Sequence, residues 1–427
     1  MAIADTTHRA FDERLVLPGD IVLTTTTAAI STAIRTVIRA DISHAMICVE
    51  HASVIDSTGE GVHGRNLARI VLEPGCAGYV LRPRKPLTEQ QLQAVVRYAR
   101  EQVGTRYSVF QAGKSIVGGR HPGLKQFCSR LVAQAYHCAG VALSENPDFC
   151  HPGELLSSSL LEEVHGVLIP LTPEEAAFRT DGDGVQPMRD VTNALLERVR
   201  VIAPKVESIN DIIPHLLEHP EVDDEFVEAL QASGYLVAWR WSVEATPWQY
   251  DVSRLEAQPR SVEDKKAYCI ALLDGERWQP HRFVTNRGGY LELSVRAPRR
   301  YFEMMADLHT LLATLHAQRV KTAREWLKGQ GFTIPDAPPP PRPHTTEWFA
   351  LLQHWDPPKA AKTQYVIERA DSIDVCSVCG DDPASDFELR DAPPAGPSTI
   401  RLCDDCYRIR SADEPMRPFV SSPTLVG

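Results

Sequence analysis

Four of the ten cysteines in the chain stand in two closely spaced pairs near its C-terminus, and no other feature constrains the fold of a region so strongly. Cys376 and Cys379 form one Cys-x2-Cys pair, and Cys403 and Cys406 form the second. Each pair can hold a metal ion through two sulfurs, so the two pairs together complete a tetrahedral Zn²⁺ site. Because four thiolates leave no open coordination position, we expect a structural zinc ion without a catalytic role. An iron–sulfur cluster or a redox dithiol pair is the alternative.

The rest of the composition is that of a protein with several globular domains. A chain of 427 residues suits two or three domains, and 43% apolar residues suffice for sizeable cores. No apolar run approaches the ~20 residues of a membrane span, and the first residues lack the apolar stretch of a secretory signal. The other cysteines are scattered, which favours a reducing compartment. We therefore expect a cytoplasmic protein, or one exported without a signal peptide.

Changes in composition along the chain mark the boundaries of four segments. Strand-like runs alternate with helical patterns up to about residue 170, which predicts an α+β fold class for the N-terminal domain. A run with five prolines in eight positions predicts a semi-rigid polyproline linker. The predicted segments are the α+β domain at 1–175, a middle α+β region at 185–335, the proline-rich linker at 336–344, and a C-terminal segment at 345–427 with the zinc module at about 372–412.

The middle region carries no motif that indicates a particular chemistry. Apolar and polar residues alternate at 236–243 and 290–296, which predicts strands, and a helix is expected at 301–328. Trp239, Trp241 and Trp248 are candidates for a stacking surface, but on a strand Trp239 and Trp241 would share one face, so we expect them to pack in a core.

Cys128 opens the helical pattern that carries the chemistry of the N-terminal domain. The apolar residues at +3, +4, +7 and +8 from it lie on one face of a helix that Gly140 can end: Leu131, Val132, Ala135 and Tyr136. Cys128 thus falls in the first turn, where unpaired backbone N–H groups and the positive end of the helix dipole stabilise a thiolate. The same N–H groups are suited to hold an oxyanion. Without further information, an ordinary core cysteine remains the commoner interpretation.

A thiolate needs a proton partner, and His44 is the candidate. It opens a strand-like run, 44–50, and a second run, 53–58, follows after a short turn. In such a hairpin, cross-strand neighbours can bring the Asp56 carboxylate to the His44 ring, where it would fix the tautomer and stabilise the imidazolium. Glu50 is the alternative orienting residue, although it lies six positions along the same strand.

Several segments, taken in order along the chain, resemble a known family. They are 17–23 (LPGDIVL), 43–47, 54–62, 104–107, 127–132 and 151–155. Together they resemble the circularly permuted papain-like branch of the NlpC/P60 superfamily, which includes the YiiX/YaeF-like proteins and the relatives of lecithin–retinol acyltransferase. The resemblance covers about residues 15–160 and implies a permuted papain-like fold, in which the histidine precedes the cysteine in sequence.

This resemblance implies that Cys128 is the nucleophile, His44 the general base and acid, and Asp56 the residue that orients His44. Asp56 stands where a glutamate is expected in YiiX-like members. The implied reaction cleaves an amide, ester or thioester through a thioacyl-enzyme intermediate. Peptides, lipid esters and other acyl conjugates are all substrates in the family, so the substrate stays open. The alternatives are a catalytically inactive papain-like scaffold that recruits partners through the zinc module, and a lipid-directed phospholipase or acyltransferase.

The C-terminal cysteine pairs and their neighbours at 395–398 and 402–406 resemble the zinc-binding domain of the ClpX unfoldase, which implies contact with a partner protein or dimerisation. Acidic residues beside the cysteines, such as Asp404, and the net charge of −11 argue against binding to nucleic acid. His215 and His219 share a helical face, but they lack the glutamate of a zinc-protease helix, so no second metal site is expected there.

Overall fold

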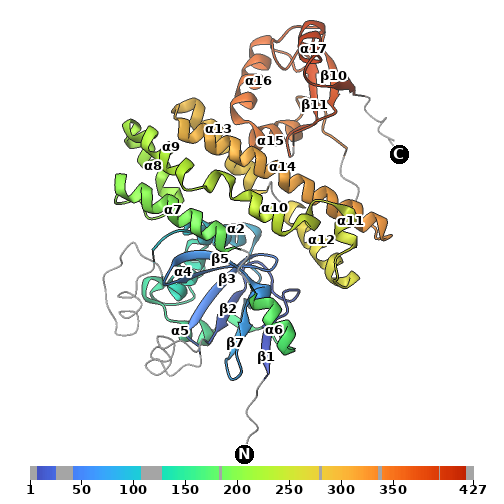
Figure 1. The fold of residues 1–427 in the computed structure, drawn as a ribbon. Helices are drawn as coiled ribbons and strands as arrows, with labels where there is room; N and C mark the ends of the chain where they lie inside the picture. The colour runs from blue at the N-terminus through green and yellow to red at the C-terminus, as the bar shows by residue number, and fades with distance from the viewer. Residues whose placement is uncertain are drawn as a thin grey trace, which may run out of the picture. The chain divides into compact units, whose positions relative to one another are not determined.

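The computed structural model of the chain divides into two compact units, Met1–Ser242 and Val243–Gly427 (Figure 1). The boundary falls inside the predicted middle region, so the helices of that region belong to both units. In the described ranges, no helix combines the length and the apolar character that a membrane span requires. The structure describes residues 7–25, 42–106, 127–181, 185–277, 281–334, 339–393 and 395–419.

A six-stranded antiparallel sheet lies at the centre of the first unit, with the strand order β5-β4-β3-β2-β7-β8 (Figure 1). Helices α2 (Glu89–Glu101) and α4 (Cys128–Cys138) pack against each other and against β3. Helix α4 begins at Cys128, as predicted. The strands are β2 (Ile21–Thr24), β3 (His44–Glu50), β4 (Ser53–Thr58), β5 (Gly61–Asn66), β7 (Gly78–Pro83) and β8 (Leu161–Glu163).

Two apolar cores fix the hairpin of β3 and β4. One core contains Ile47 and Ile55 together with Leu131 of α4, and the other contains Met46 and Val54. Alternate residues of the hairpin therefore pack on opposite sides, which holds its register because a one-residue slip would expose both apolar sets. The second core also includes part of a small sheet with the order β6-β1-β9: β1 (His8–Phe11), β6 (Val71–Leu72) and β9 (Leu168–Leu171).

The turn before β2 is built by a glycine and a buried carboxylate. Gly19 has a φ of +91°, a backbone conformation that residues with a side chain rarely adopt. Asp20 is 2% exposed, accepts a hydrogen bond from the backbone N–H of Leu17, and forms a two-pronged ion pair with Arg82 of β7. Gly19 and Asp20 thus shape the turn that leads into β2.

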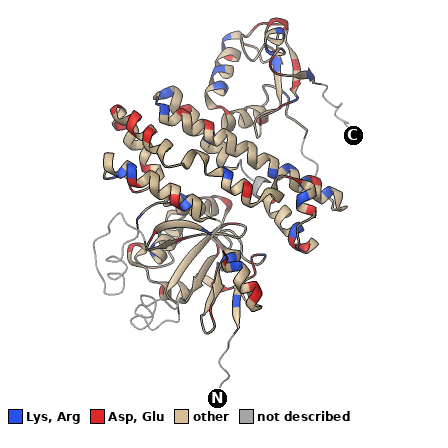
Figure 2. Cartoon of the chain, viewed as in Figure 1, with Lys and Arg blue, Asp and Glu red and all other residues tan. Residues whose placement is uncertain are grey.

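Helix α7 (Gln186–Ile202) joins the helical part of the first unit to its α+β domain. Arg189, 7% exposed, forms an ion pair of 2.7 Å with Glu60 in the turn between β4 and β5. Arg200 donates to the carbonyl oxygen of Gly104 at 2.9 Å. The helices that follow α7 are α8 (Ile212–Glu218), α9 (Asp223–Ala232) and α10 (Trp239–Ala245). Acidic side chains gather on α9, where three of them occupy its first turn (Figure 2).

The second unit consists of helices followed by a small β-module. The long helix α14 buries Trp326, whose indole N–H donates to Glu256 at 2.5 Å. Together with Leu327, Trp326 packs against Cys269 of α12. The helices of the unit are α11 (Val252–Glu256), α12 (Val262–Arg277), α13 (Arg282–Arg296), α14 (Arg300–Gly329), α15 (Thr346–Trp355) and α16 (Pro357–Ala370). The helix predicted at 301–328 is confirmed.

The prediction of an α+β middle region is wrong. Within its described residues there is no strand: 236–243 contains a short 3-10 turn and most of α10, and 290–296 is the second half of α13. Tyr290 is buried and stacks on His309 of α14, so packing between two helices overrides a short alternating pattern. Trp241 is 42% exposed, so the predicted buried strand face with Trp239 does not exist.

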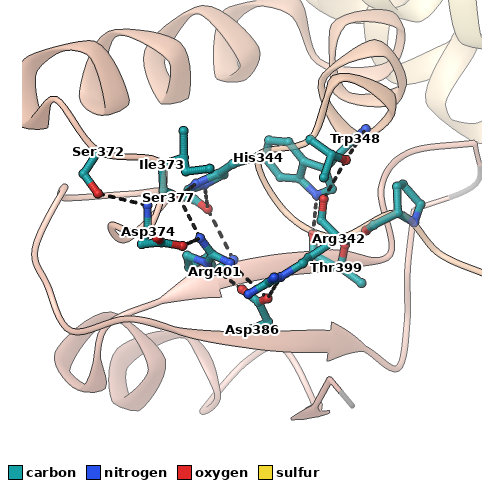
Figure 3. Close-up of polar contacts among 12 residues, drawn as sticks. Arg342, His344, Trp348, Ser372, Ile373, Asp374, Ser377, Asp386, Thr399 and Arg401 are labelled. Atoms are coloured by element: carbon teal, nitrogen blue, oxygen red, sulfur yellow. Dashed lines mark hydrogen bonds and ion pairs between the residues drawn. The ribbon is translucent and has the colours of Figure 1, made fainter. Parts of the chain in front are cut away.

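The C-terminal module is a three-stranded sheet with the order β11-β10-β12 and one short helix. Its elements are β10 (Ser385–Leu389), β11 (Thr399–Leu402), α17 (Asp404–Arg410) and β12 (Met416–Pro418). Arg401 of β11 is 4% exposed and forms ion pairs with Asp386 of β10 and with Asp374 (Figure 3). The buried Arg401 guanidinium thus ties the sheet to Asp374, a largely exposed residue in the segment that precedes the first cysteine pair.

The described part of the proline-rich linker, 339–344, is bound to this module rather than extended away from it. Arg342 forms an ion pair with Asp386, and the Thr399 hydroxyl donates to the carbonyl oxygen of Pro341 (Figure 3). His344 is 8% exposed and hydrogen-bonded through both ring nitrogens, at 2.7 Å each, to the Ile373 carbonyl oxygen and the Ser377 hydroxyl. We call residues 339–344 the strap.

Candidate active site and metal centre

Cys128 is the first residue of α4. The preceding residue, Phe127, is extended (φ −141°, ψ 162°), and no side chain caps the start of the helix. The N–H groups of the first turn therefore direct their positive potential at the thiol, as the sequence predicts. Cys128 is 7% exposed, and the predicted inward face of α4 is confirmed by the burial of Leu131, Val132, Ala135 and Tyr136.

His44 and Asp56 come together across the β3–β4 hairpin. Asp56 lies opposite Met46, two residues along β3 from His44, so its side chain reaches the ring diagonally. The distance between His44 Nε2 and Asp56 Oδ2 is 2.9 Å. The Asp56 side chain is fully buried, and the His44 side chain is 18% exposed. Because Asp56 engages Nε2, the other ring nitrogen, Nδ1, is available to the thiol of Cys128.

The electrostatics of the three side chains are coupled. Burial alone would lower the pKa of His44, but the hydrogen bond to Asp56 and the contact with Cys128 outweigh it and raise the pKa to about 10. Burial alone would raise the pKa of the Cys128 thiol, but the interaction with His44 lowers it, helped by the backbone N–H groups of Ala45 and Ser129. Both shifts favour the thiolate–imidazolium pair over the neutral pair.

Three other buried cysteines, Cys48, Cys150 and Cys269, have thiol pKa values shifted in the opposite direction. Burial raises the pKa of the Cys48 thiol to about 12, and it does the same for Cys150 and Cys269. Among the residues that the structure describes, no imidazole offsets the burial of these three thiols. The lowered thiol pKa at Cys128 therefore comes from its position beside His44 and not from burial.

Two basic side chains next to Asp56 were not predicted from the sequence. Arg65 of β5 places Nε 2.8 Å from Asp56 Oδ2, and His63 lies directly opposite Asp56 in the β4–β5 pairing. His63 is 3% exposed, and its Nε2 is 2.7 Å from the carbonyl oxygen of Glu60. The strand alternation at 61–66 is the signal that places positions 63 and 65 on one face, but only the register shows that this face carries Asp56.

Other residues of the family-like segments have structural roles or lie outside the described residues. Glu50 forms an ion pair with Arg100 at 3.0 Å, at the end of β3 away from His44. His151 caps helix α5 (Pro152–Ser157) by accepting a hydrogen bond from the Glu154 N–H. The amphipathic segment at 26–40 and the segment at 118–123 that leads to Cys128 lie outside the described residues.

The four paired cysteines converge into one cluster. The sulfur atoms of Cys376, Cys379, Cys403 and Cys406 all lie within 4.8 Å of one another, with Cys379 3.6 Å from both Cys403 and Cys406. A tetrahedral ion with metal–sulfur bonds of about 2.3 Å requires sulfur separations of about 3.8 Å, so the cluster fits such an ion. The four cysteines thus form a site compatible with a metal.

His215 and His219 form no such cluster with other metal-ligating side chains among the described residues. The rings of His215 and His219 lie 4.6 Å apart between their centroids, and His219 pairs with Glu221 at 3.2 Å. Among the residues that the structure describes, the four cysteines are the one group of three or more metal-ligating side chains close enough to share an ion.

Comparisons with known proteins address the N-terminal part of the chain. No curated protein matches the chain. Among solved structures, the metalloprotein YiiX from Escherichia coli O157:H7 is similar to 34% of this chain over 95% of its own length, with 19% identity and a TM-score of 0.28. Residues 16–150, which contain His44, Asp56 and Cys128, match the family of permuted papain-like amidase enzymes of the YaeF/YiiX type, the C92 family.

Proposed function

We propose that the N-terminal domain is a thiol-dependent acyl hydrolase or acyltransferase that cleaves an amide, ester or thioester bond. In this proposal Cys128 is the nucleophile, His44 is the general base and acid, and Asp56 orients His44. The observation that carries it is the position of His44, which contacts a fully buried carboxylate through Nε2 and the thiol at the start of a helix. The match to the permuted papain-like amidases supports an amide as the first substrate class to test.

The geometry suits two-step acyl transfer. The Cys128 thiolate attacks the carbonyl carbon, and the backbone N–H groups at the start of α4 stabilise the oxyanion that forms. The His44 imidazolium then gives its proton to the leaving amine, alcohol or thiol, and a thioester to Cys128 remains. In the second step His44 removes a proton from water or from another acceptor, which attacks the thioester and releases the acyl group. Asp56 stays ionised throughout and holds the ring in place.

The test is turnover on a panel of acyl amides, esters and thioesters by the full chain. We expect Cys128→Ala and His44→Ala each to abolish turnover of the accepted class. Cys138→Ala is the matched control, because Cys138 is an exposed cysteine at the other end of α4 whose thiol pKa is raised by desolvation. Turnover that Cys128→Ala leaves unchanged would refute the proposal and favour a papain-like domain that only binds.

We further propose that the four-cysteine cluster holds one structural Zn²⁺. Cys376, Cys379, Cys403 and Cys406 would supply all four ligands, and the ion would join the segment before β10 to the start of α17. Elemental analysis of protein purified without chelators should find about one zinc per chain. Absence of zinc with all four cysteines intact would refute this assignment.

A further inference from the structure

One carboxylate oxygen of Asp56 contacts two basic side chains, those of His44 and Arg65. Its Oδ2 lies 2.9 Å from His44 Nε2 and 2.8 Å from Arg65 Nε, whereas Oδ1 has no hydrogen-bond partner among the described residues. The Arg65 Nε–H is not aligned for a hydrogen bond, so this contact is an ion pair. The Arg65 side chain is 37% exposed, whereas Asp56 is fully buried. A permanent cation therefore sits directly behind the residue that orients the imidazole.

These side chains form a row of alternating charge. In the proposed ion-pair state the row is Cys128 thiolate, His44 imidazolium, Asp56 carboxylate and Arg65 guanidinium. His63 also faces Asp56 from β5, but burial lowers its pKa, and its Nε2 is bound to the Glu60 carbonyl oxygen. Arg65 is thus the fixed positive charge next to Asp56, and it balances a carboxylate that has no access to water.

We propose that Arg65 is a positioning residue that keeps Asp56 ionised and sets the pH window in which the Cys128–His44 ion pair exists. The inference rests on the proposed function, because it concerns the same site. A cation near the row disfavours the imidazolium and favours the thiolate. Arg65 therefore shifts both limits of the window to lower pH, and a variant without this charge should have both limits at higher pH.

The pH dependence of Cys128 alkylation by iodoacetate measures these limits without a substrate. The reaction slows at low pH because the Cys128 thiolate is protonated. It also slows at high pH, because iodoacetate carries a negative charge and the imidazolium that attracts it is lost. In the full chain, followed by peptide mass spectrometry, we expect both midpoints of Arg65→Gln to move upward by about one pH unit. Arg65→Lys should restore the wild-type profile, because it keeps the charge.

Arg84→Gln is the matched control, because Arg84 forms only an exposed ion pair with Glu162 on the same unit. An Arg65→Gln profile identical to that of the wild type would overturn the proposal. Should Arg65→Gln fail to fold, Asp56→Asn and Asp56→Asn/Arg65→Gln replace it, since the double variant buries no unpaired charge. The upper midpoint of the Cys128 alkylation profile should be higher in the double variant than in Asp56→Asn, and equal midpoints would overturn the proposal. A wild-type profile without two midpoints would overturn the proposed function as well.

Discussion

Removing the Cys128 thiol should add a pH dependence to the folding stability of the first unit that the Cys128–His44 pair does not cause in the wild type. In the proposed native state one proton of the pair sits on His44, whose pKa is raised from 6.5 to about 10, and the thiol pKa is lowered from 9.0. In the unfolded chain between pH 6.5 and 9 the same single proton sits on the thiol instead. Folding moves this proton from sulfur to nitrogen without net uptake, so the pair adds no pH dependence.

In Cys128→Ala the folded and unfolded states no longer bind the same number of protons. Asp56 still raises the pKa of His44, so the folded protein binds a proton that the unfolded chain releases above pH 6.5. The stability that His44 contributes is complete below its pKa in the unfolded chain, and it is lost as pH rises through its raised pKa in the folded protein. The free energy of unfolding should fall by about 1.4 kcal/mol per pH unit at most, and by about 1 kcal/mol between pH 7.5 and 8.5.

Hydrogen exchange of β3 and β4 peptides against urea, corrected for the intrinsic exchange rate at each pH, reports this local free energy in the full chain. The reference is Cys128→Ala/His44→Gln, which lacks the imidazole and retains every other titrating group. We expect the slope against pH to be steeper in Cys128→Ala than in this reference, with the wild type close to the reference. Equal slopes in Cys128→Ala and the reference would refute the reasoning that Asp56 holds a proton on His44.

Three further predictions follow from the other contacts. Glu50→Gln should leave the alkylation profile of Cys128 unchanged and cost at most about 1 kcal/mol in urea unfolding, because the ion pair of Glu50 with Arg100 is partly exposed and lies away from His44. A shifted profile would contradict this. Cys403→Ser should lower zinc content and speed limited proteolysis of the C-terminal module; unchanged zinc would contradict the assignment. His344→Ala should release zinc to a chelator about tenfold faster, whereas the exposed His354→Ala should match the wild type.

The local patterns of the N-terminal domain were sufficient to predict the elements that carry the candidate site. The strand pattern at 44–50 and the helix that begins at Cys128 are each set by their own alternation or periodicity, and both appear where the sequence places them. The contact of Asp56 with His44 was also predictable, because a short turn leaves few registers for the hairpin. Arg65 was not, since its approach to Asp56 depends on a second hairpin whose register the sequence does not specify.

The middle region could not be predicted for a different reason. The alternation at 290–296 is short, and such runs do not distinguish a strand from a helix unless their packing partners are known. Here the partner is α14, against which Tyr290 packs. The strap shows the same limit at longer range: the prolines predict an extended backbone, but the ion pair between Arg342 and Asp386 joins positions far apart in sequence.

The strap also determines how the C-terminal module would carry mechanical load. Tension on the chain ahead of residue 339 would first meet the ion pair of Arg342 with Asp386 and the hydrogen bond between Pro341 and Thr399. Both contacts transmit force sideways into β10 and β11, and β11 leads directly to Cys403. Pulling on the proline-rich segment would therefore load the strands next to the cysteine cluster before it unwinds α15.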